Sequence, residues 1–358
     1  MLDGIPPERI EHASQIFQIV RAAKSPIDLL SLSFADEDDD TLAYDHPIEP
    51  PTPDQEAARC DQMQRRLATH CNGLLTTSPS ATTPIPTVHH LHPTIRAYLH
   101  RPTTWTRLTT PTPPHLALAH ASLLRLRTAR LTPTQHHTHT LTNPPPASLA
   151  ALLLAAIAAL TALDAAAAAL HADLWDALAA TTQTLVARAG LCAAPGCWCR
   201  GPADAGDGPL LAVAVRARAV GYVAYRLGRT WVRVRAERVE SGAAGVLGFA
   251  VAAGVGEGGD EEEGRARVVA MLLEWGADPN FRGGVARSPW EEVVEGGGVE
   301  EFGAEVWEEM LRYGADRKVV GLTGGMLDSS GMREKRKRTW MKRVWRREDG
   351  RMRWKRKV

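Results

Sequence analysis

The stretch "VVAMLLEWGADPNFRGGVARSPWEEVV", residues 268–294, decides the fold of the C-terminal part of the chain. Its apolar residues recur at helical spacing before the Gly-Ala-Asp, which predicts an amphipathic helix. Gly276 stands where a helix end needs a residue that tolerates positive φ, and the following Asp-Pro favours a turn. Ser288, with Pro289 next and Glu291 three residues on, is typical of the start of another helix. The stretch therefore predicts a helix, a tight turn and a second helix.

The same pattern occurs a second time. "EVWEEMLRYGADRK", residues 305–318, repeats the apolar helix and the Gly-Ala-Asp, and Gly314 follows Gly276 by 38 residues. A helix–turn–helix unit that recurs after a few tens of residues predicts a helical repeat array. "LLEWGADPN" resembles the end of an ankyrin second helix, and "SPWEEVV" and "GVLGFAVAAG" are similar to ankyrin first helices. We therefore expect two degenerate ankyrin-like repeats over residues 241–320.

The ankyrin resemblance implies a protein partner that binds the concave and loop face of the repeats. The expected protein-binding residues are Trp275, Asp278, Asn280, Trp290, Tyr313 and Asp316. Because about three repeats are usually needed to bury a continuous core, we expect these two to lean on the preceding domain.

The N-terminal segment, residues 1–105, carries three helix-like stretches, two short strand-like stretches and a further helix. Asp28 is placed to cap the second helix, "DLLSLSFAD". The strand-like stretches "GLLTT" and "TVHHLH" flank a Ser/Thr/Pro loop and precede the helix-like "PTIRAYLHR". This order is that of a winged-helix domain, so the sequence predicts a mainly α fold that begins with a winged-helix-like unit.

Within this segment, "RRLATHCNGLL" and "VHHLHPTIRAYLHRPTTW" resemble the region that follows the NACHT NTPase module in fungal NACHT proteins. Those proteins are STAND-type ATPases, and many end in ankyrin repeats. In that family a winged-helix histidine contacts bound ADP, and His92 lies at the similar position. The usual Leu-His-Arg-Thr is replaced here by a sequence with Pro93 after the histidine. His92 is a candidate nucleotide sensor, with a structural hydrogen bond at a strand–helix junction as the alternative.

The middle of the chain predicts a linker followed by long helices. Residues 106–146 are rich in Thr, Pro and His, which predicts a linker with one helix, "HLALAHASLLRLR", inside it. Residues 147–240 open with an Ala/Leu-rich stretch, and these residues are strong helix formers. "ASLAALLLAAIAALTAL" is shorter than the roughly 20 apolar residues of a membrane span, so we expect a buried helix and no membrane span.

Three cysteines in this region, Cys192, Cys197 and Cys199, offer thiolates with His171 as a conceivable fourth ligand. Their spacing departs from the Cys-x2-4-Cys of structural zinc sites. A plain loop is the preferred interpretation, and we expect no metal and no cofactor. Five cysteines, an odd number, and the absence of a secretion signal favour an intracellular protein, cytoplasmic or nuclear.

The C-terminal tail, residues 321–358, is strongly basic. Residues 333–357 hold 14 Lys/Arg and 3 Asp/Glu, a net charge of +11, so the rest of the chain carries −10. Cations and interleaved tryptophans are compatible with nucleic acid, whereas the simpler expectation is a disordered, solvated end. A minimal nuclear-import-like cluster is formed by Lys335, Arg336, Lys337 and Arg338.

No Gly-x-x-x-x-Gly-Lys-Ser/Thr occurs in the sequence, so the phosphate cradle of the NACHT module is missing. Catalytic motifs such as Gly-x-Ser-x-Gly and His-Glu-x-x-His are also missing. The expectation is therefore a non-catalytic protein-interaction module related to fungal NACHT–ankyrin receptors, either a truncated relative or part of one. Two alternatives remain: a nucleic-acid-binding protein that uses winged helix and tail, and a subunit of a split NTPase whose NACHT module lies on a separate chain.

Overall fold

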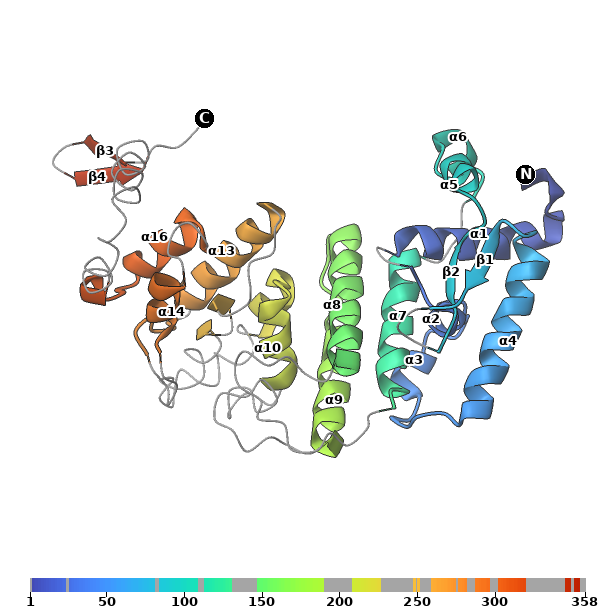
Figure 1. The fold of residues 1–358 in the computed structure, drawn as a ribbon, viewed down its shortest axis with the longest axis horizontal. Coiled ribbons are helices and arrows are strands. Elements are labelled where there is room, and N and C mark those ends of the chain that lie inside the picture. The colour runs from blue at the N-terminus through green and yellow to red at the C-terminus, as the bar shows by residue number, and fades with distance from the viewer. Residues whose placement is uncertain are drawn as a thin grey trace.

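The computed structural model describes residues 2–23, 26–80, 84–108, 113–130, 147–189, 208–226, 247–248, 250–251, 259–274, 276–281, 287–296, 302–319, 345–348 and 351–354. The expected mainly α fold is confirmed, because helices dominate and strands are few and short. Figure 1 shows the parts in chain order along the long axis, with residues 2–130 at one end and residues 259–319 toward the other. Trp275, Cys192, Cys197, Cys199 and the Lys335–Arg338 cluster lie outside the described residues.

The first unit consists of helices around a small sheet. Its elements are η1 (Leu2–Gly4), α1 (Pro7–Ala22), α2 (Leu29–Ala35), α3 (Leu42–Asp45), α4 (Pro53–His70), β1 (Leu75–Ser78) and β2 (Thr87–His90). The two strands pair antiparallel, as the two strand-like stretches predicted. The segment between α1 and α2 joins β2 from the other edge: Leu29 N donates to Pro86 O (2.8 Å) and Val88 N donates to Ile27 O (2.8 Å).

Local capping explains where the helices of this unit begin. The predicted cap of α2 is confirmed, since Asp28 Oδ1 accepts from Ser31 N at 2.7 Å. At α4, Thr52 Oγ1 accepts from Gln55 N and Gln55 Oε1 accepts from Thr52 N, which makes a capping box. These bonds satisfy backbone donors that a helix start leaves free.

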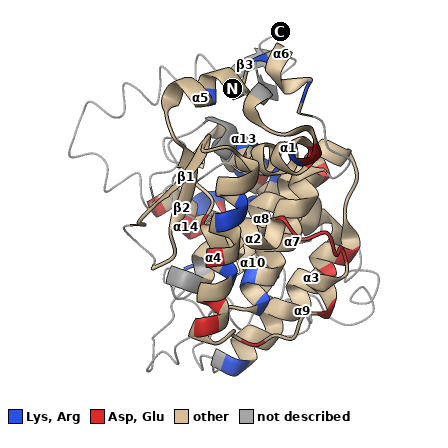
Figure 2. Ribbon diagram, turned by 90° about the vertical axis from the view of Figure 1, so that its right-hand side faces the viewer, with Lys and Arg blue, Asp and Glu red and all other residues tan. Residues whose placement is uncertain are grey.

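Two short helices, α5 (Pro93–Leu99) and α6 (Pro102–Trp105), follow the hairpin. Figure 2 shows blue and no red on these two helices, so they carry arginine and no carboxylate. The Arg21 guanidinium lies 3.8 Å over the Trp105 ring, a cation–π contact that fastens α6 to the end of α1.

Helix α7 (Pro114–Arg127) lies within the segment 106–146 that the sequence describes as a partly helical linker. It contacts α1, α2 and α3 as well as the two helices that follow, α8 (Ala147–Ala167) and α9 (Ala172–Ala189). Its buried residues are Ala117, Ala119, Ala121, Leu123, Leu124 and Leu126. The helical part of this segment is therefore a central element of the packed core.

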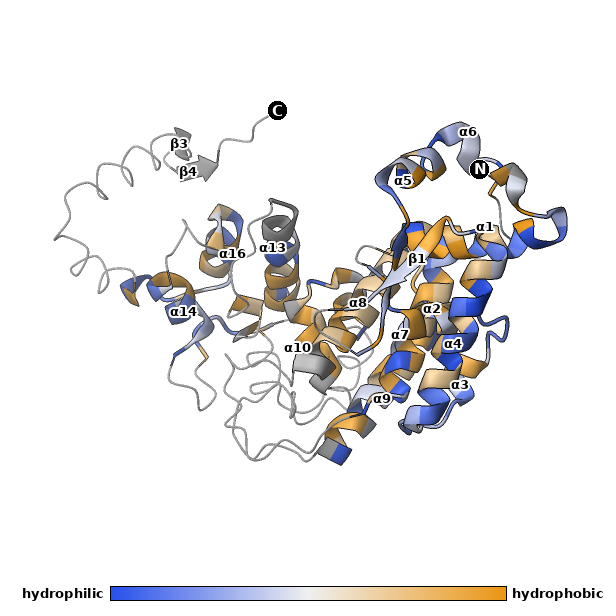
Figure 3. Cartoon of the chain, turned by 45° about the vertical axis from the view of Figure 1, so that its right-hand side comes forward, coloured by the Kyte–Doolittle hydropathy of each residue, from blue (hydrophilic) through white to orange (hydrophobic). Residues whose placement is uncertain are grey.

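Helix α8 packs against α7 along a stripe of larger apolar residues. The buried positions are Leu149, Leu153, Ala156, Ile157, Leu160 and Leu163. The hydrophobic colour dominates this helix in Figure 3. None of the described helices combines the length and the apolar character needed to cross a bilayer, and α8 uses its leucines for packing within the chain.

A hydrogen-bonded turn joins α8 to α9. Asp164 accepts from the backbone N (2.8 Å) and the Nδ1 (2.9 Å) of His171, and its second oxygen accepts from Trp175 Nε1 (2.7 Å). Trp175 stacks on Tyr222 with ring centroids 4.4 Å apart. Tyr222 lies in the helical residues 220–226 that follow α10 (Gly208–Arg216), so this stack ties α9 to the next part of the chain.

The C-terminal helices are α13 (Gly259–Glu274), α14 (Pro289–Glu295) and α16 (Ala304–Arg312), and α13 packs beside α16. Both predicted glycine ends are confirmed, since Gly276 and Gly314 each have φ +92°. Ala277 N donates to Leu272 O, and Ala315 N donates in the same way to the carbonyl of the residue five positions earlier. Each end is therefore a Schellman motif. The predicted capping box is present at the start of α14.

Part of the tail is described as an antiparallel hairpin of β3 (Trp345–Glu348) and β4 (Arg351–Trp354), with Trp345 opposite Trp354. The expectation of a disordered tail is wrong for these residues. Alternating positions paired across a tight connection provide backbone hydrogen bonds that the composition alone does not reveal.

Candidate functional site

The two Gly-Ala-Asp turns of the repeats have the same local structure and bond directly to each other. Asp278 Oδ1 accepts from Asn280 N (2.8 Å), and Asp316 Oδ1 accepts from Lys318 N (2.9 Å), at positions 38 residues apart. Asn280 then bridges the turns: its Nδ2 donates to Gly314 O (2.9 Å) and its Oδ1 accepts from Asp316 N (2.8 Å). The first turn thus holds the second in register through one amide side chain.

Trp290 lies behind these turns and is fully buried, with 0% of its surface exposed. Its Nε1 donates to Asp316 O (2.8 Å), its backbone N donates to Pro279 O (2.9 Å), and its ring lies 4.7 Å from that of Trp307. The expectation that Trp290 contacts a partner is wrong, because its side chain is used inside the repeats. A polar indole N–H needs a buried acceptor, and the neighbouring turn supplies one.

Four of the expected binding residues remain accessible at the turns, and we call Asp278, Asn280, Tyr313 and Asp316 the turn surface. Both carboxylates are exposed, Asn280 is half-buried, and the Tyr313 ring is 36% exposed. A rigid turn that carries an exposed aromatic ring beside acidic groups is the kind of surface that a protein partner contacts. The arrangement holds these groups without any partner present, since each turn is fixed by its own backbone bonds.

A second polar arrangement lies inside the first unit, around Asp36. This residue is the C-cap of α2, and its side chain is 0% exposed. A negative charge at a helix C-terminus is unfavourable unless cations balance it. Arg66 Nη1 lies 2.8 Å from Asp36 Oδ2, and His12 Nε2 lies 3.1 Å from Asp36 Oδ1. The acidic "DEDDD" stretch is therefore partly neutralised inside the fold rather than fully presented to solvent.

Two histidines in this cluster have opposite pKa shifts. The short contact to the Asp36 carboxylate raises the pKa of His12 above its ordinary value, although partial burial opposes the shift. His70 lies against His12, with ring centroids 4.5 Å apart. Burial lowers the pKa of His70, and the neighbouring charges of His12 and Arg9 lower it further.

These shifts predict a pH-dependent stability for the first unit. A raised pKa means that His12 stabilises the fold below about pH 6.5 and that this stabilisation is lost as the pH rises. A lowered pKa means that neutral His70 suits the fold above about pH 6.5 and that stability is lost as the pH falls. The wild-type advantage over His12→Gln should therefore grow toward acid pH, and the advantage over His70→Gln should shrink. Denaturant unfolding at several pH values measures both, and two flat differences would contradict the assignment.

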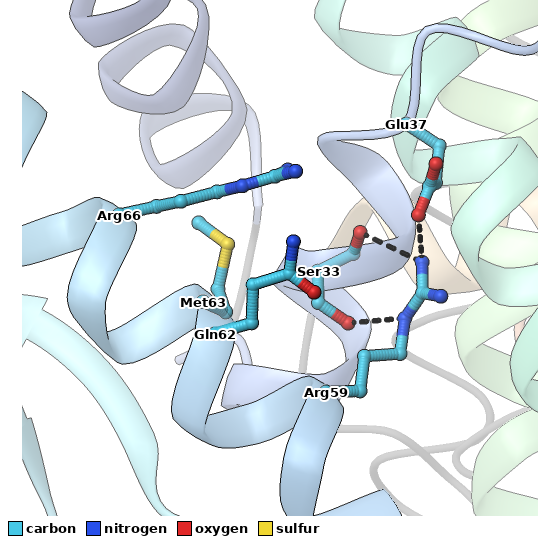
Figure 4. A pocket seen from close by; sticks show the side chains of 6 residues that line it. All are labelled: Ser33, Glu37, Arg59, Gln62, Met63 and Arg66. Atoms are coloured by element: carbon cyan, nitrogen blue, oxygen red, sulfur yellow. Dashed lines mark hydrogen bonds and ion pairs between the residues drawn. The ribbon is translucent and has the colours of Figure 1, made fainter. Parts of the chain in front are cut away.

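A small hollow opens beside this cluster, between α2 and α4 (Figure 4). Its lining residues are Ser33, Glu37, Arg59, Gln62, Met63 and Arg66. Arg59 donates to the Ser33 hydroxyl (2.9 Å) and carbonyl (3.2 Å) and pairs with Glu37. The hollow encloses about 200 Å³, below the roughly 300–1,000 Å³ of typical small-molecule pockets. Its polar groups therefore serve mainly to join α2 to α4.

The structure places the other predicted residues in structural roles. His92 is the N-cap of α5, where its Nδ1 accepts from Thr94 N (3.2 Å) and contacts Thr94 Oγ1 (2.8 Å). This is the structural alternative that the sequence left open. His171, the conceivable fourth metal ligand, is bonded to Asp164. Within the described residues, no three His, Cys, Asp or Glu side chains converge as a metal site.

The Asp36 cluster, in contrast, was not predicted, because its residues come from three helices and no local spacing marks them. Comparison with known proteins adds one finding about this unit. Residues 4–141 match a family model described as "Domain of unknown function (DUF7791)". No curated protein and no solved structure matches the chain. The matched segment runs past the hairpin and includes all of α7, the helix that contacts both the first unit and α8.

Proposed function

We propose that this chain is a non-catalytic interaction module that offers the turn surface of two ankyrin-like repeats to a protein partner. The observation that carries the proposal is the repeated turn: two Schellman ends, each with an aspartate bonded to the backbone, coupled through Asn280. Repeats that stack in this way present equivalent groups at regular intervals along one face. Such a face suits a protein better than a small molecule.

The topology of the first unit supports a winged-helix-like assignment. A helix, a short edge segment at residues 27–29, two further helices and a hairpin follow one another, and the edge segment pairs with β2. The short α3 is an additional turn of helix between the second and third main helices. A relation to the regulatory and sensor parts of fungal NACHT receptors rests on the resemblance of this unit and of the repeats. On this proposal, a separate NACHT-bearing chain is a candidate partner.

Affinity capture with the purified full chain tests the proposal. We expect the substitutions Asp278→Asn, Tyr313→Ser and Asp316→Asn, made together, to abolish capture of a partner that the wild type retains. Asparagine keeps the side-chain acceptor of each turn, so the repeats should stay folded while the surface loses two charges and its ring.

A matched control carries the same kinds of change on the exposed part of α4: Asp54→Asn, Asp61→Asn and Gln64→Ser. This control should capture the partner as the wild type does. Equal capture by all three proteins would contradict the assignment of the turn surface. ATP turnover by the purified chain above contaminant background would contradict the non-catalytic proposal.

A further inference from the structure

One face of the first unit has an unbalanced positive charge. The sequence contains no Asp or Glu between residues 62 and 163, although arginine and histidine are frequent there. The structure gathers part of this segment with the end of α1. We call the exposed residues of this surface the basic face: Arg21, His92, Arg96, His100, Arg101 and Arg107.

The cations of the basic face lie close to one another. The His90 and His100 rings have centroids 6.2 Å apart. Burial lowers the pKa of His90, and the charges of His100 and Arg96 lower it further. For His100 the order is the same, with burial first and then Arg21 and Arg96. Neighbouring cations thus disfavour a charge on these rings, and an anion placed among them would remove that penalty.

No carboxylate of the described chain pairs with Arg21, Arg96 or Arg101 within ion-pair distance. Along α1, Glu11 precedes Arg21 by ten residues, which is about 15 Å of helix. The acidic residues after α2 bind elsewhere, since Asp36 contacts Arg66 and Glu37 contacts Arg59. The positive field of the basic face is therefore available to a partner.

From this surface we infer that the basic face binds the phosphate backbone of a nucleic acid without reading its sequence. Arginine and histidine at several positions suit a string of phosphates better than a single anion. The two aromatic rings of the face are already covered, Trp105 by Arg21 at 3.8 Å and Tyr98 by Arg101 at 6.0 Å. Since these rings are engaged, backbone contact is favoured over base stacking. The inference does not depend on the proposed role of the turn surface.

The position of the face also indicates how the unit would approach nucleic acid. Helix α4 follows α2 in the place of a recognition helix, but its first half exposes Asp54 and Asp61. Carboxylates there would repel phosphates. The hairpin side with α5 and α6 is the compatible side, where Figure 2 shows blue and no red.

Fluorescence anisotropy of a labelled DNA duplex of random sequence, over a series of KCl concentrations, tests the inference on the full chain. The basic tail binds in every variant, so the difference between variants reports the face. In Arg96→Gln/Arg101→Gln we expect the slope of log K against log salt to fall by about 0.9 for each arginine that contacts a phosphate. Wild-type binding should also tighten between about pH 8 and pH 6, as the imidazoles gain charge.

Arg317→Gln/Lys318→Gln removes the same two charges from an exposed turn of the repeats and is the matched control. Its slope should equal that of the wild type. Equal slopes for both variants would overturn the inference. So would a loss of binding to phosphatidylserine vesicles in the Arg96→Gln/Arg101→Gln variant with unchanged duplex binding, because the face would then serve a membrane surface. Unchanged thermal unfolding of both variants confirms that any loss is electrostatic.

Discussion

Trp290→Ala is expected to lower the free energy of unfolding of the repeat segment by about 3–5 kcal/mol, the usual cost of truncating a buried tryptophan. The indole is 0% exposed, packs on Trp307 and donates to Asp316 O. Removal leaves a cavity between α14 and α16 and a carbonyl without its donor. In an array of two repeats, each contacting only its neighbour, no further unit compensates for this loss.

Hydrogen exchange of the full chain locates the effect, since the chain has 10 tryptophans and total fluorescence cannot separate them. Protection should collapse over residues 259–274 and 302–319 and remain in α7 and α8. Tyr313→Ala, at a ring that is 36% exposed, is the control and should change protection little. Protection that survives Trp290→Ala would show that the turns hold the repeats without the indole. The same variant should also lose the captured partner, because the turn surface requires both turns in register.

Trp175→Ala is the second large effect, again about 3–5 kcal/mol from the loss of a buried ring. Trp175 is 1% exposed, stacks on Tyr222 and donates to Asp164. Without the indole, Asp164 keeps the two bonds from His171 but loses its third donor. The helices α9 and α10 should then separate in a step distinct from unfolding of the first unit, measurable as an earlier loss of exchange protection at residues 208–226.

Trp175→Phe divides this effect into its parts. The phenyl ring keeps most of the stack but cannot donate to the carboxylate, so the cost should be about 1.5–3 kcal/mol, the value of a hydrogen bond to a charged group. A phenylalanine variant as unstable as the alanine variant would show that the bond to Asp164, rather than the stack, holds α9 to Tyr222.

Local signals in the sequence were enough to predict several elements. Gly276 and Gly314 adopt the positive φ that their positions after apolar helices predicted, and Ser288 and Asp28 cap the helices that follow them. These features depend on neighbours within a few residues, so the order of residues alone decides them. The charge of the basic face belongs partly to this class, since the absence of carboxylates from residues 62–163 is a property of the sequence.

Long-range packing decided the rest. Trp290 was expected at a binding surface, but the turn 26 residues later supplies an acceptor that makes burial favourable. His12, Asp36 and His70 come from separate helices, and no spacing in the sequence marks them as one cluster. Helix α7 was expected inside a linker, and the structure places it against helices on both sides of it in the chain. The sequence thus determined the turns, the caps and the charge of each segment. Only the tertiary structure decided which polar groups are buried together, because a buried charge or N–H selects its partner by distance in space and not by separation along the chain.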